Sequence, residues 1–153
     1  MFERIQNKRI IIPVYLEDIV EKLNEATDHW EQYLNVTTGR FVSLSDGAYY
    51  DVDEALVELI EASDCFYRLP NQHDIHEYRI METFTADITD STMKSRLIQA
   101  LNGKRPYYHF KNEIRYLGLD KAYYAFRNSA FMDIARKWCV DNQLPFKLRS
   151  ELL

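Results

Sequence analysis

Cysteine, glycine and proline are scarce in this sequence, which holds two, four and four of them among 153 residues. The two cysteines, Cys65 and Cys139, lie far apart and form neither a metal-binding spacing nor a disulfide framework. No two glycines lie close together, so the glycine-rich loops that cradle phosphates are absent from the sequence. No G-x-S-x-G segment occurs either, which argues against a serine-hydrolase nucleophile elbow.

Long apolar runs are missing as well. The stretch RIIIPVYL, residues 9–16, is too short for a signal peptide, and no cleavage motif follows it. Nothing approaches the roughly 20 apolar residues of a membrane-spanning helix. Cysteines without a disulfide pattern fit reduced thiols, so we expect a cytoplasmic protein that does not enter a membrane.

Glycine and proline mark the boundaries of the segments that do occur. The sequence contains no repeat, no low-complexity tract and no linker, so we predict one domain over residues 1–153, with loosely ordered ends at 1–8 and 146–153. The hydrophobic share of 46% is typical of a globular chain. The predicted fold class is α+β and mainly helical, with a small sheet, a hairpin plus one strand, in the first half.

The first half carries the strand patterns. Residues 9–14 predict an extended segment or short strand, and residues 16–27 an amphipathic helix. Residues 30–44 alternate as a hairpin whose turn contains Gly39, and residues 65–69 predict a third strand. A lone hairpin is marginal in water, so we expect the third strand to join it.

One further helix is predicted between the hairpin and the third strand. Asp51 and Glu54 resemble a capping box at its start. Acidic residues occupy one side of this helix, and the other side is expected to be buried through Val52, Ala55, Leu56, Leu59 and Ile60.

The second half is helical. The patterns predict helices over residues 74–88, 90–102, 106–117 and 120–142. The last is the longest and is apolar around most of its circumference, so we expect it to be central. Its main stripe, with Phe126, Ile134 and Trp138 expected to be buried, also includes Tyr123, Arg127 and Ala130. The alternative is that one stripe forms a dimer surface, which leaves a homodimer open.

Charge is divided unevenly along the chain. The net charge of −5 is the sum of −11 over residues 1–88, with 7 Lys+Arg and 18 Asp+Glu, and +6 over residues 89–153, with 12 and 6. The interpretation that we favour is that the two halves neutralise each other. The alternative is a basic face for an anionic partner.

Candidates for chemistry are few. His73 and His76 stand three residues apart at a helix start, but a zinc site needs further ligands and none is suggested. Glu82 is either a half-buried carboxyl group or, as we favour, the partner of Arg79 or Arg96 in an ion pair. We recognise no catalytic residue, and we expect no cofactor and no metal.

A stretch of interleaved aromatic and basic residues, 104–124, is the remaining candidate for function. Exposed Tyr and Arg are frequent at protein interfaces, so a non-catalytic interaction or accessory protein with a protein partner is our first interpretation. Binding of RNA or other single-stranded nucleic acid, in which bases stack on aromatic rings, is the alternative, and a hydrolase comes third. The candidate partner-binding residues are Lys104, Arg105, Tyr108, His109, Lys111, Arg115 and Tyr124.

The order of these segments, over roughly residues 12–144, resembles an uncharacterised bacterial protein family, UPF0158. The resemblance is carried by Ile12-Pro13-Val14, Tyr33-Leu34, Thr38-Gly39, Leu69-Pro70, Met81-Glu82, Phe84, Ala100-Leu101, Gly103, Tyr107, Phe110-Lys111, Tyr123-Tyr124-Ala125-Phe126 and Trp138. It implies no assigned activity. The chain departs from the family pattern at three places. Tyr108-His109 stands where relatives usually have two basic residues, Tyr123 stands where they usually have Trp, and Gln143 stands where they usually have a capping Gly.

Overall fold

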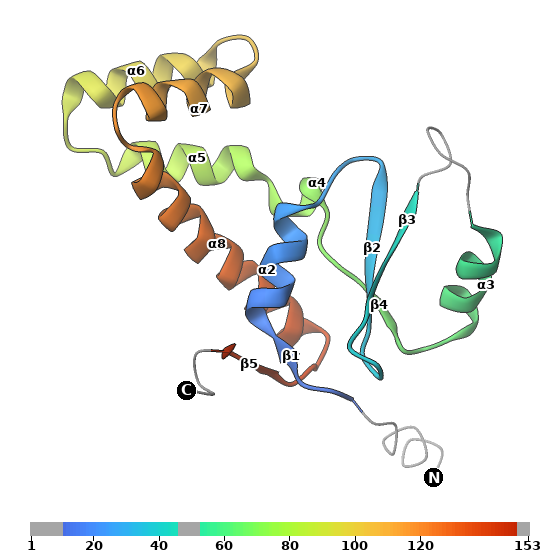
Figure 1. The fold of residues 1–153 in the computed structure, drawn as a ribbon. Coiled ribbons are helices and arrows are strands. Elements are labelled where there is room, and N and C mark those ends of the chain that lie inside the picture. The colour runs from blue at the N-terminus through green and yellow to red at the C-terminus, as the bar shows by residue number, and fades with distance from the viewer. Residues whose placement is uncertain (1–10, 46–52, 150–153) are drawn as a thin grey trace. The chain divides into compact units, whose positions relative to one another are not determined.

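The computed structural model describes residues 11–45 and 53–149 of the chain. It divides into two compact units (Figure 1). The sheet unit comprises residues 1–75 and 132–153, and the helical unit comprises residues 76–131. The longest helix contributes residues to both units, so this division does not test the prediction of one domain. The predicted class, mainly helical α+β with a small sheet, is confirmed.

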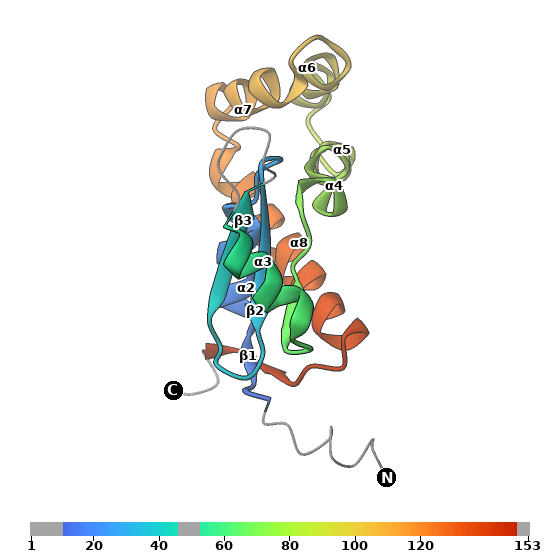
Figure 2. The same ribbon diagram turned by 90° about the vertical axis from the view of Figure 1, so that its right-hand side faces the viewer.

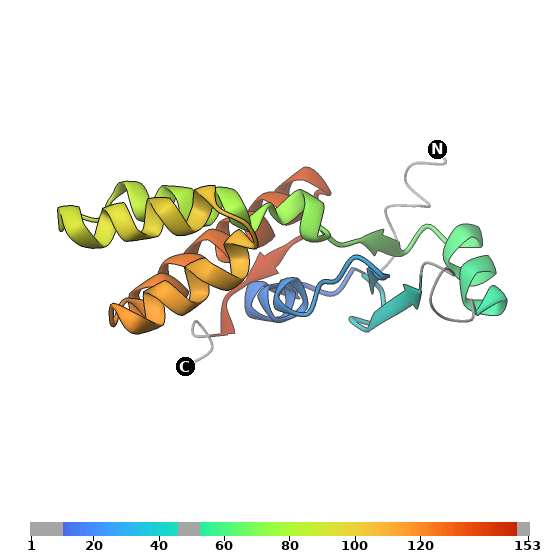
Figure 3. The ribbon, with the colours of Figure 1, turned by 90° about the horizontal axis from the view of Figure 1, so that it is seen from above.

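The helical unit consists of α5 (Glu77–Ala86), α6 (Ser91–Asn102), α7 (Pro106–Tyr116) and the first part of α8 (Asp120–Asp141). Asp90 caps α6 by accepting a hydrogen bond of 3.0 Å from the Met93 amide. In Figures 1 and 3, α6 and α7 lie side by side as a helical hairpin. The core of the helical unit is apolar and aromatic, and it includes Met81, Phe84, Leu97, Phe110, Ile114 and Tyr123.

The sheet unit is built on an antiparallel sheet with the strand order β3-β2-β4. These strands are β2 (Trp30–Asn35), β3 (Phe41–Ser45) and β4 (Phe66–Arg68), so the predicted hairpin and third strand are confirmed. Gly39 supplies the positive φ, 77°, that the hairpin turn requires. The amphipathic helix α2 (Leu16–Asn24) buries Leu16, Ile19, Val20 and Leu23.

The tail that the sequence predicts to be loosely ordered begins with a strand. β5 (Phe146–Lys147) pairs in parallel with β1 (Val14–Tyr15), in a second, two-stranded sheet. Arg149 then binds α2 in two ways. Its amide donates to the Glu17 carboxylate, and its guanidinium donates to both oxygens of Asp18 at 2.8 and 2.7 Å. Main-chain pairing and an ion pair therefore hold residues 146–149 in place.

The helix predicted from residue 74 to residue 88 is interrupted. α4 (Gln72–Ile75) and α5 are separated by His76, which has a left-handed φ of 55°. This conformation is unfavourable for a residue with a side chain, and it stops the helix. A pattern of apolar spacing does not detect such a break, because Ile75 and Tyr78 keep helical spacing across it.

The predicted burial of the long helix is correct only in part. Trp138 is buried, and its indole N–H donates a hydrogen bond of 2.9 Å to the carbonyl of Arg68. Phe126 and Ile134 are only half-buried. The buried residues of α8 form a narrower stripe of Tyr123, Phe131, Ala135, Trp138 and Cys139. The apolar arc is therefore wider than the surface that neighbouring elements cover.

The helix between the hairpin and the third strand is less buried than the sequence predicts. α3 (Glu54–Ala62) has no buried residue, and Leu59 is 54% exposed. Its cap is Asp53, which accepts a hydrogen bond of 3.1 Å from the Leu56 amide; the predicted capping residue Asp51 lies outside the described residues, as does Val52. Figure 2 shows α3 on the near side of the sheet and α2 on the far side.

Candidate interaction surface on the helical unit

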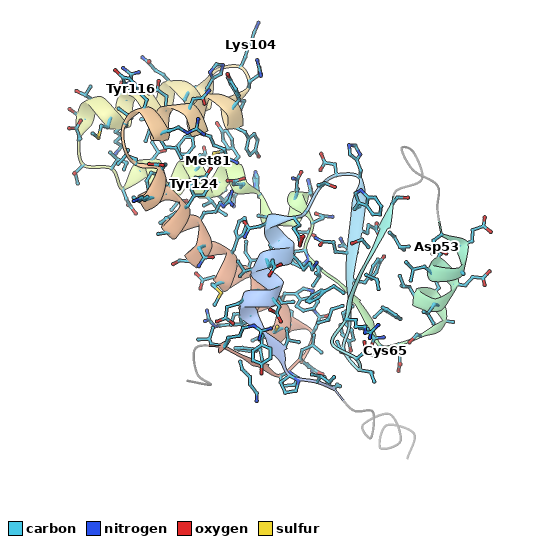
Figure 4. The ribbon with its side chains drawn as sticks, viewed as in Figure 1. Asp53, Cys65, Met81, Lys104, Tyr116 and Tyr124 are labelled. Carbon is cyan, nitrogen blue, oxygen red and sulfur yellow. The ribbon has the colours of Figure 1, made fainter. Side chains whose placement is uncertain are left out.

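The loop between α6 and α7 places two cations at the end of the helical hairpin. Pro106 occupies the first turn of α7, where its missing N–H costs no hydrogen bond. Arg105 precedes it with a left-handed φ of 51°, which turns the chain sharply into α7. Lys104 extends from the tip of the hairpin, away from both helices (Figure 4). The loop therefore presents Lys104 and Arg105 to solvent.

The outward side of α7 carries two exposed tyrosines, each with an arginine over its ring. Tyr108 is 53% exposed, and the guanidinium carbon of Arg105 lies 4.4 Å from its ring centroid. Tyr116 is 75% exposed, with Arg96 of α6 4.8 Å from its centroid. Cation–π contacts of this kind reduce the freedom of exposed side chains. Arg115, also exposed, lies on the same side of the helix by its spacing from Tyr108.

A polar groove of about 510 Å³ runs between α6 and α7. Within it, Arg96 and Glu113 form a bidentate ion pair, with both N···O distances at 2.9 Å. The hydrogen bond from Arg96 holds the pKa of Glu113 below its ordinary value. The groove is lined by Arg96, Gln99, Ala100, Gly103, Lys104, His109, Asn112 and Glu113.

A second polar cluster lies elsewhere in the helical unit, centred on the Glu77 carboxylate. Tyr123 donates to it at 2.6 Å, Arg127 at 3.0 Å and Lys111 at 3.5 Å. Burial alone would raise the pKa of Glu77, but the bond from Tyr123 and the two nearby cations outweigh it, so the pKa lies below its ordinary value. Burial and the carboxylate raise the pKa of the Tyr123 hydroxyl.

The predicted partner-binding residues therefore do not form one surface. Lys104, Arg105, Tyr108, His109 and Arg115 belong to the loop and the exposed sides of α7. Lys111 instead binds the Glu77 carboxylate. Tyr124 is 40% exposed on α8, where its ring lies 5.2 Å from that of Tyr123 and under the guanidinium of Arg127.

Sequence reasoning assigned no polar contact to Glu113, Glu77 or Arg127, and it gave Arg96 the wrong partner. The sequence pattern suggests Arg79 or Arg96 as the partner of Glu82, and the pair with Arg96 is wrong, since Arg96 binds Glu113. Glu82 is exposed and lines a small cavity beside α6 with Lys94 and Ile98. One signal points to Glu113, which is the single carboxylate between residues 91 and 119 among several cations.

The remaining polar candidates are not gathered into a recognisable centre. His73 and His76 are both exposed. Over residues 11–45 and 53–149, no group of three or more His, Cys, Asp or Glu side chains could hold a metal ion. Cys139 is buried, and burial raises the pKa of its thiol to about 11. Within the same residues, no helix has the length and apolar content to cross a membrane.

The fold and this surface define a small, mainly helical α+β protein that displays an Arg- and Tyr-rich helical hairpin. The chain belongs to the uncharacterised protein family UPF0158, whose family model matches residues 9–153. This confirms the resemblance drawn from the sequence. No curated protein and no solved structure matches the chain.

Proposed function

We propose that this chain is a non-catalytic, cytoplasmic bacterial protein that binds a partner protein through the α6–α7 loop and the outward side of α7. The observation that carries the proposal is the pair of exposed tyrosines, Tyr108 and Tyr116, each stacked with an arginine. Tyr and Arg are, together with Trp, the residues enriched among interface hot spots. A ring that is already ordered by a guanidinium loses less conformational entropy when it is buried by a partner.

Charge indicates what kind of partner surface would fit. The helical unit contains nine Lys+Arg and six Asp+Glu, a net charge of +3, whereas the remaining residues contain ten and eighteen, a net charge of −8. Lys104, Arg105 and Arg115 are exposed around Tyr108. A partner with an acidic surface would complement them, and such complementarity mainly raises the association rate.

Single-stranded nucleic acid is the second candidate, favoured by the same grouping of cations around an exposed ring. A base could stack on Tyr108 while Lys104 and Arg115 meet the phosphates. Two observations favour protein instead. Lys111 is bound to Glu77, and position 109 holds a histidine rather than a lysine or an arginine.

Capture experiments from native cytoplasm with nuclease present distinguish the two candidates. A partner protein should be retained by the wild-type chain and lost by Tyr108→Ala/Tyr116→Ala. It should still be retained by Val140→Ala, which shortens an exposed apolar residue of the sheet unit. If both tyrosines are hot spots, the purified pair should weaken by about 30-fold or more, equivalent to about 2 kcal/mol. Capture that disappears with nuclease would indicate nucleic acid, and capture unaffected by the double variant would reject this surface.

A further inference from the structure

The outer edge of β3 is the feature of the sheet unit that the proposed function leaves unexplained. In the order β3-β2-β4, β3 pairs with β2 alone among the strands that the structure describes. Its five residues, FVSLS, include no charge and no proline. Soluble proteins usually protect an open sheet edge with a charge, a proline or a short strand. The opposite edge follows this rule, because β4 has three residues, contains Arg68 and is followed by Leu69-Pro70.

The register shows which main-chain groups of β3 point away from β2, towards the outer edge of the sheet. The Asn35 amide donates to the Arg40 carbonyl at 2.8 Å, and Leu34 is paired with Phe41. Hydrogen-bonded and non-hydrogen-bonded pairs alternate along an antiparallel ladder. Val42 and Leu44 therefore bond to β2. The N–H and C=O groups of Phe41 and Ser43 point away from β2.

The side chains of β3 divide between the two faces of the sheet. The side-chain amide of Gln32 donates to the Lys22 carbonyl of α2, so residues on that face of the sheet point towards α2. Ser43, paired with Gln32, shares this face. Val42 and Leu44 lie on the other face, towards α3, and both are half-buried.

We propose that two copies of this chain associate edge to edge through β3, antiparallel, about a two-fold axis at Ser43. In this register Ser43 exchanges both hydrogen bonds with Ser43 of the second copy, so its outward main-chain groups are satisfied. Phe41 lies opposite Ser45 of the second copy. On the α3 face, Val42 lies opposite Leu44 of the second copy, an apolar cross-strand pair on each side of the axis.

The second copy fits this edge because β3 is complementary to itself. An isologous contact needs a surface that matches its own image, and an uncharged strand places no like charges opposite each other. The axis is perpendicular to the sheet, so both α3 helices lie on the same face of the joined six strands.

The dimer should have a low affinity, and this affinity should rise with salt concentration. Pairing of two five-residue strands buries less than the roughly 1,200 Å² of a standard interface, so we expect micromolar affinity. Each sheet unit carries a net charge of −8, and this repulsion is screened by salt. Association should therefore strengthen as ionic strength rises, whereas binding of an acidic partner to α7 should weaken.

Light scattering during size-exclusion chromatography, from about 1 to about 300 µM chain, measures the association. The mass should rise from one chain towards two. Amide hydrogen exchange at Ser43 should slow by about tenfold or more over the same range, while Val42 and Leu44 stay protected throughout. A single-chain mass at every concentration would overturn the proposal. So would a dimer in which exchange at the Ser43 amide does not change.

Three variants at Ser43 separate the edge from other contacts. Ser43→Lys places two cations opposite each other at the axis, and the exposed side chain should accept it in the monomer. Ser43→Pro removes an outward N–H without breaking the ladder to β2. Both should remain single chains at about 300 µM, while Ser43→Thr should still dimerise. Thermal melts check that each variant folds, and dimerisation of folded Ser43→Lys and Ser43→Pro would reject the β3 interface.

Discussion

The hydroxyl of Tyr123 donates a hydrogen bond of 2.6 Å to the carboxylate of Glu77, which joins the first turns of α8 and α5. Tyr123 is fully buried, and its ring packs edge-on against Phe84 and Phe110 at 5.3 and 5.2 Å. The bond therefore anchors a polar group inside an aromatic cluster. Buried polar groups need such partners, because an unpaired one costs the full energy of its desolvation.

Tyr123→Phe keeps the ring and removes this bond. We expect a loss of about 1–3 kcal/mol in the free energy of unfolding, because Glu77 stays half-buried with one donor fewer. Urea denaturation measures it. Tyr124→Phe is the matched control, since it removes a hydroxyl from a ring that is 40% exposed, and its change should stay within about 0.5 kcal/mol. Equal losses of unfolding free energy in both variants would show that the Tyr123–Glu77 bond stabilises the fold no more than an exposed hydroxyl does.

The same cluster should make stability depend on pH. The pKa of Glu77 is lower in the folded chain than its ordinary value of 4.5, so the ionised carboxylate stabilises the fold. This contribution is complete above the unfolded pKa and is lost as the pH falls through the folded pKa. The stability difference between wild type and Glu77→Gln should therefore shrink between about pH 6 and about pH 3.

Melts of both proteins across this range test the prediction. Glu82→Gln, an exposed position on the same helix, should differ from wild type by no more than about 0.5 kcal/mol at neutral pH. A wild-type advantage over Glu77→Gln that grows towards low pH would reverse the assigned sign.

Trp138 should be a major contributor to the stability of the sheet unit. It is 9% exposed, and its indole N–H is bonded to the carbonyl of Arg68. Trp138→Ala should cost about 3–5 kcal/mol, because it leaves a cavity and an unpaired carbonyl. Val140→Ala, two residues further on and 60% exposed, should change stability by less than about 0.5 kcal/mol. A loss below about 1 kcal/mol for Trp138→Ala in urea would show that this residue is not core.

The sequence predicted those parts of the fold that follow from local periodicity and turn chemistry. The helix at 120–142 ends within a residue of α8, and the hairpin around Gly39 has the strands expected. The break at His76 and the pairing of Phe146 with Val14 were not predicted. Both depend on contacts between distant residues or on one unusual backbone angle, which spacing along a helix or strand does not reveal.

The candidate surface was predictable in composition but not in grouping. Lys104, Arg105 and Tyr108 are exposed neighbours, as the sequence suggested. Lys111 stands only three positions from Tyr108, yet it binds Glu77. The direction in which Lys111 points depends on which side of α7 is buried. Phe110 and Ile114 are the buried positions of this helix, and Lys111 lies next to them. Arg96 could not be placed in the surface either, because its contact with Tyr116 crosses from α6 to α7.

The last prediction separates a protein partner from nucleic acid. Replacing Lys104, Arg105 and Arg115 together with Gln should leave binding to mixed single-stranded RNA weak and almost unchanged. Lys111 stays in place, because its ion pair with Glu77 would confuse an effect on binding with one on stability. The reason for the expected result is electrostatic. The residues outside the helical unit carry a net charge of −8, which repels phosphates, and Lys111 is already neutralised.

Fluorescence anisotropy at about 50 mM and about 200 mM salt measures the affinity, because salt cations compete with Lys and Arg for the phosphates and weaken binding as their concentration rises. The matched control removes three cations from the sheet unit through Arg136→Gln, Lys137→Gln and Lys147→Gln, all of them exposed. Nucleic acid is the ligand of this surface if wild type binds RNA with micromolar affinity and salt weakens this binding steeply. The α7 variant should then lose the binding, while the control variant should keep it. Weak binding in all three proteins, with nuclease-resistant capture of a protein by wild type, would leave a protein partner as the function of α7.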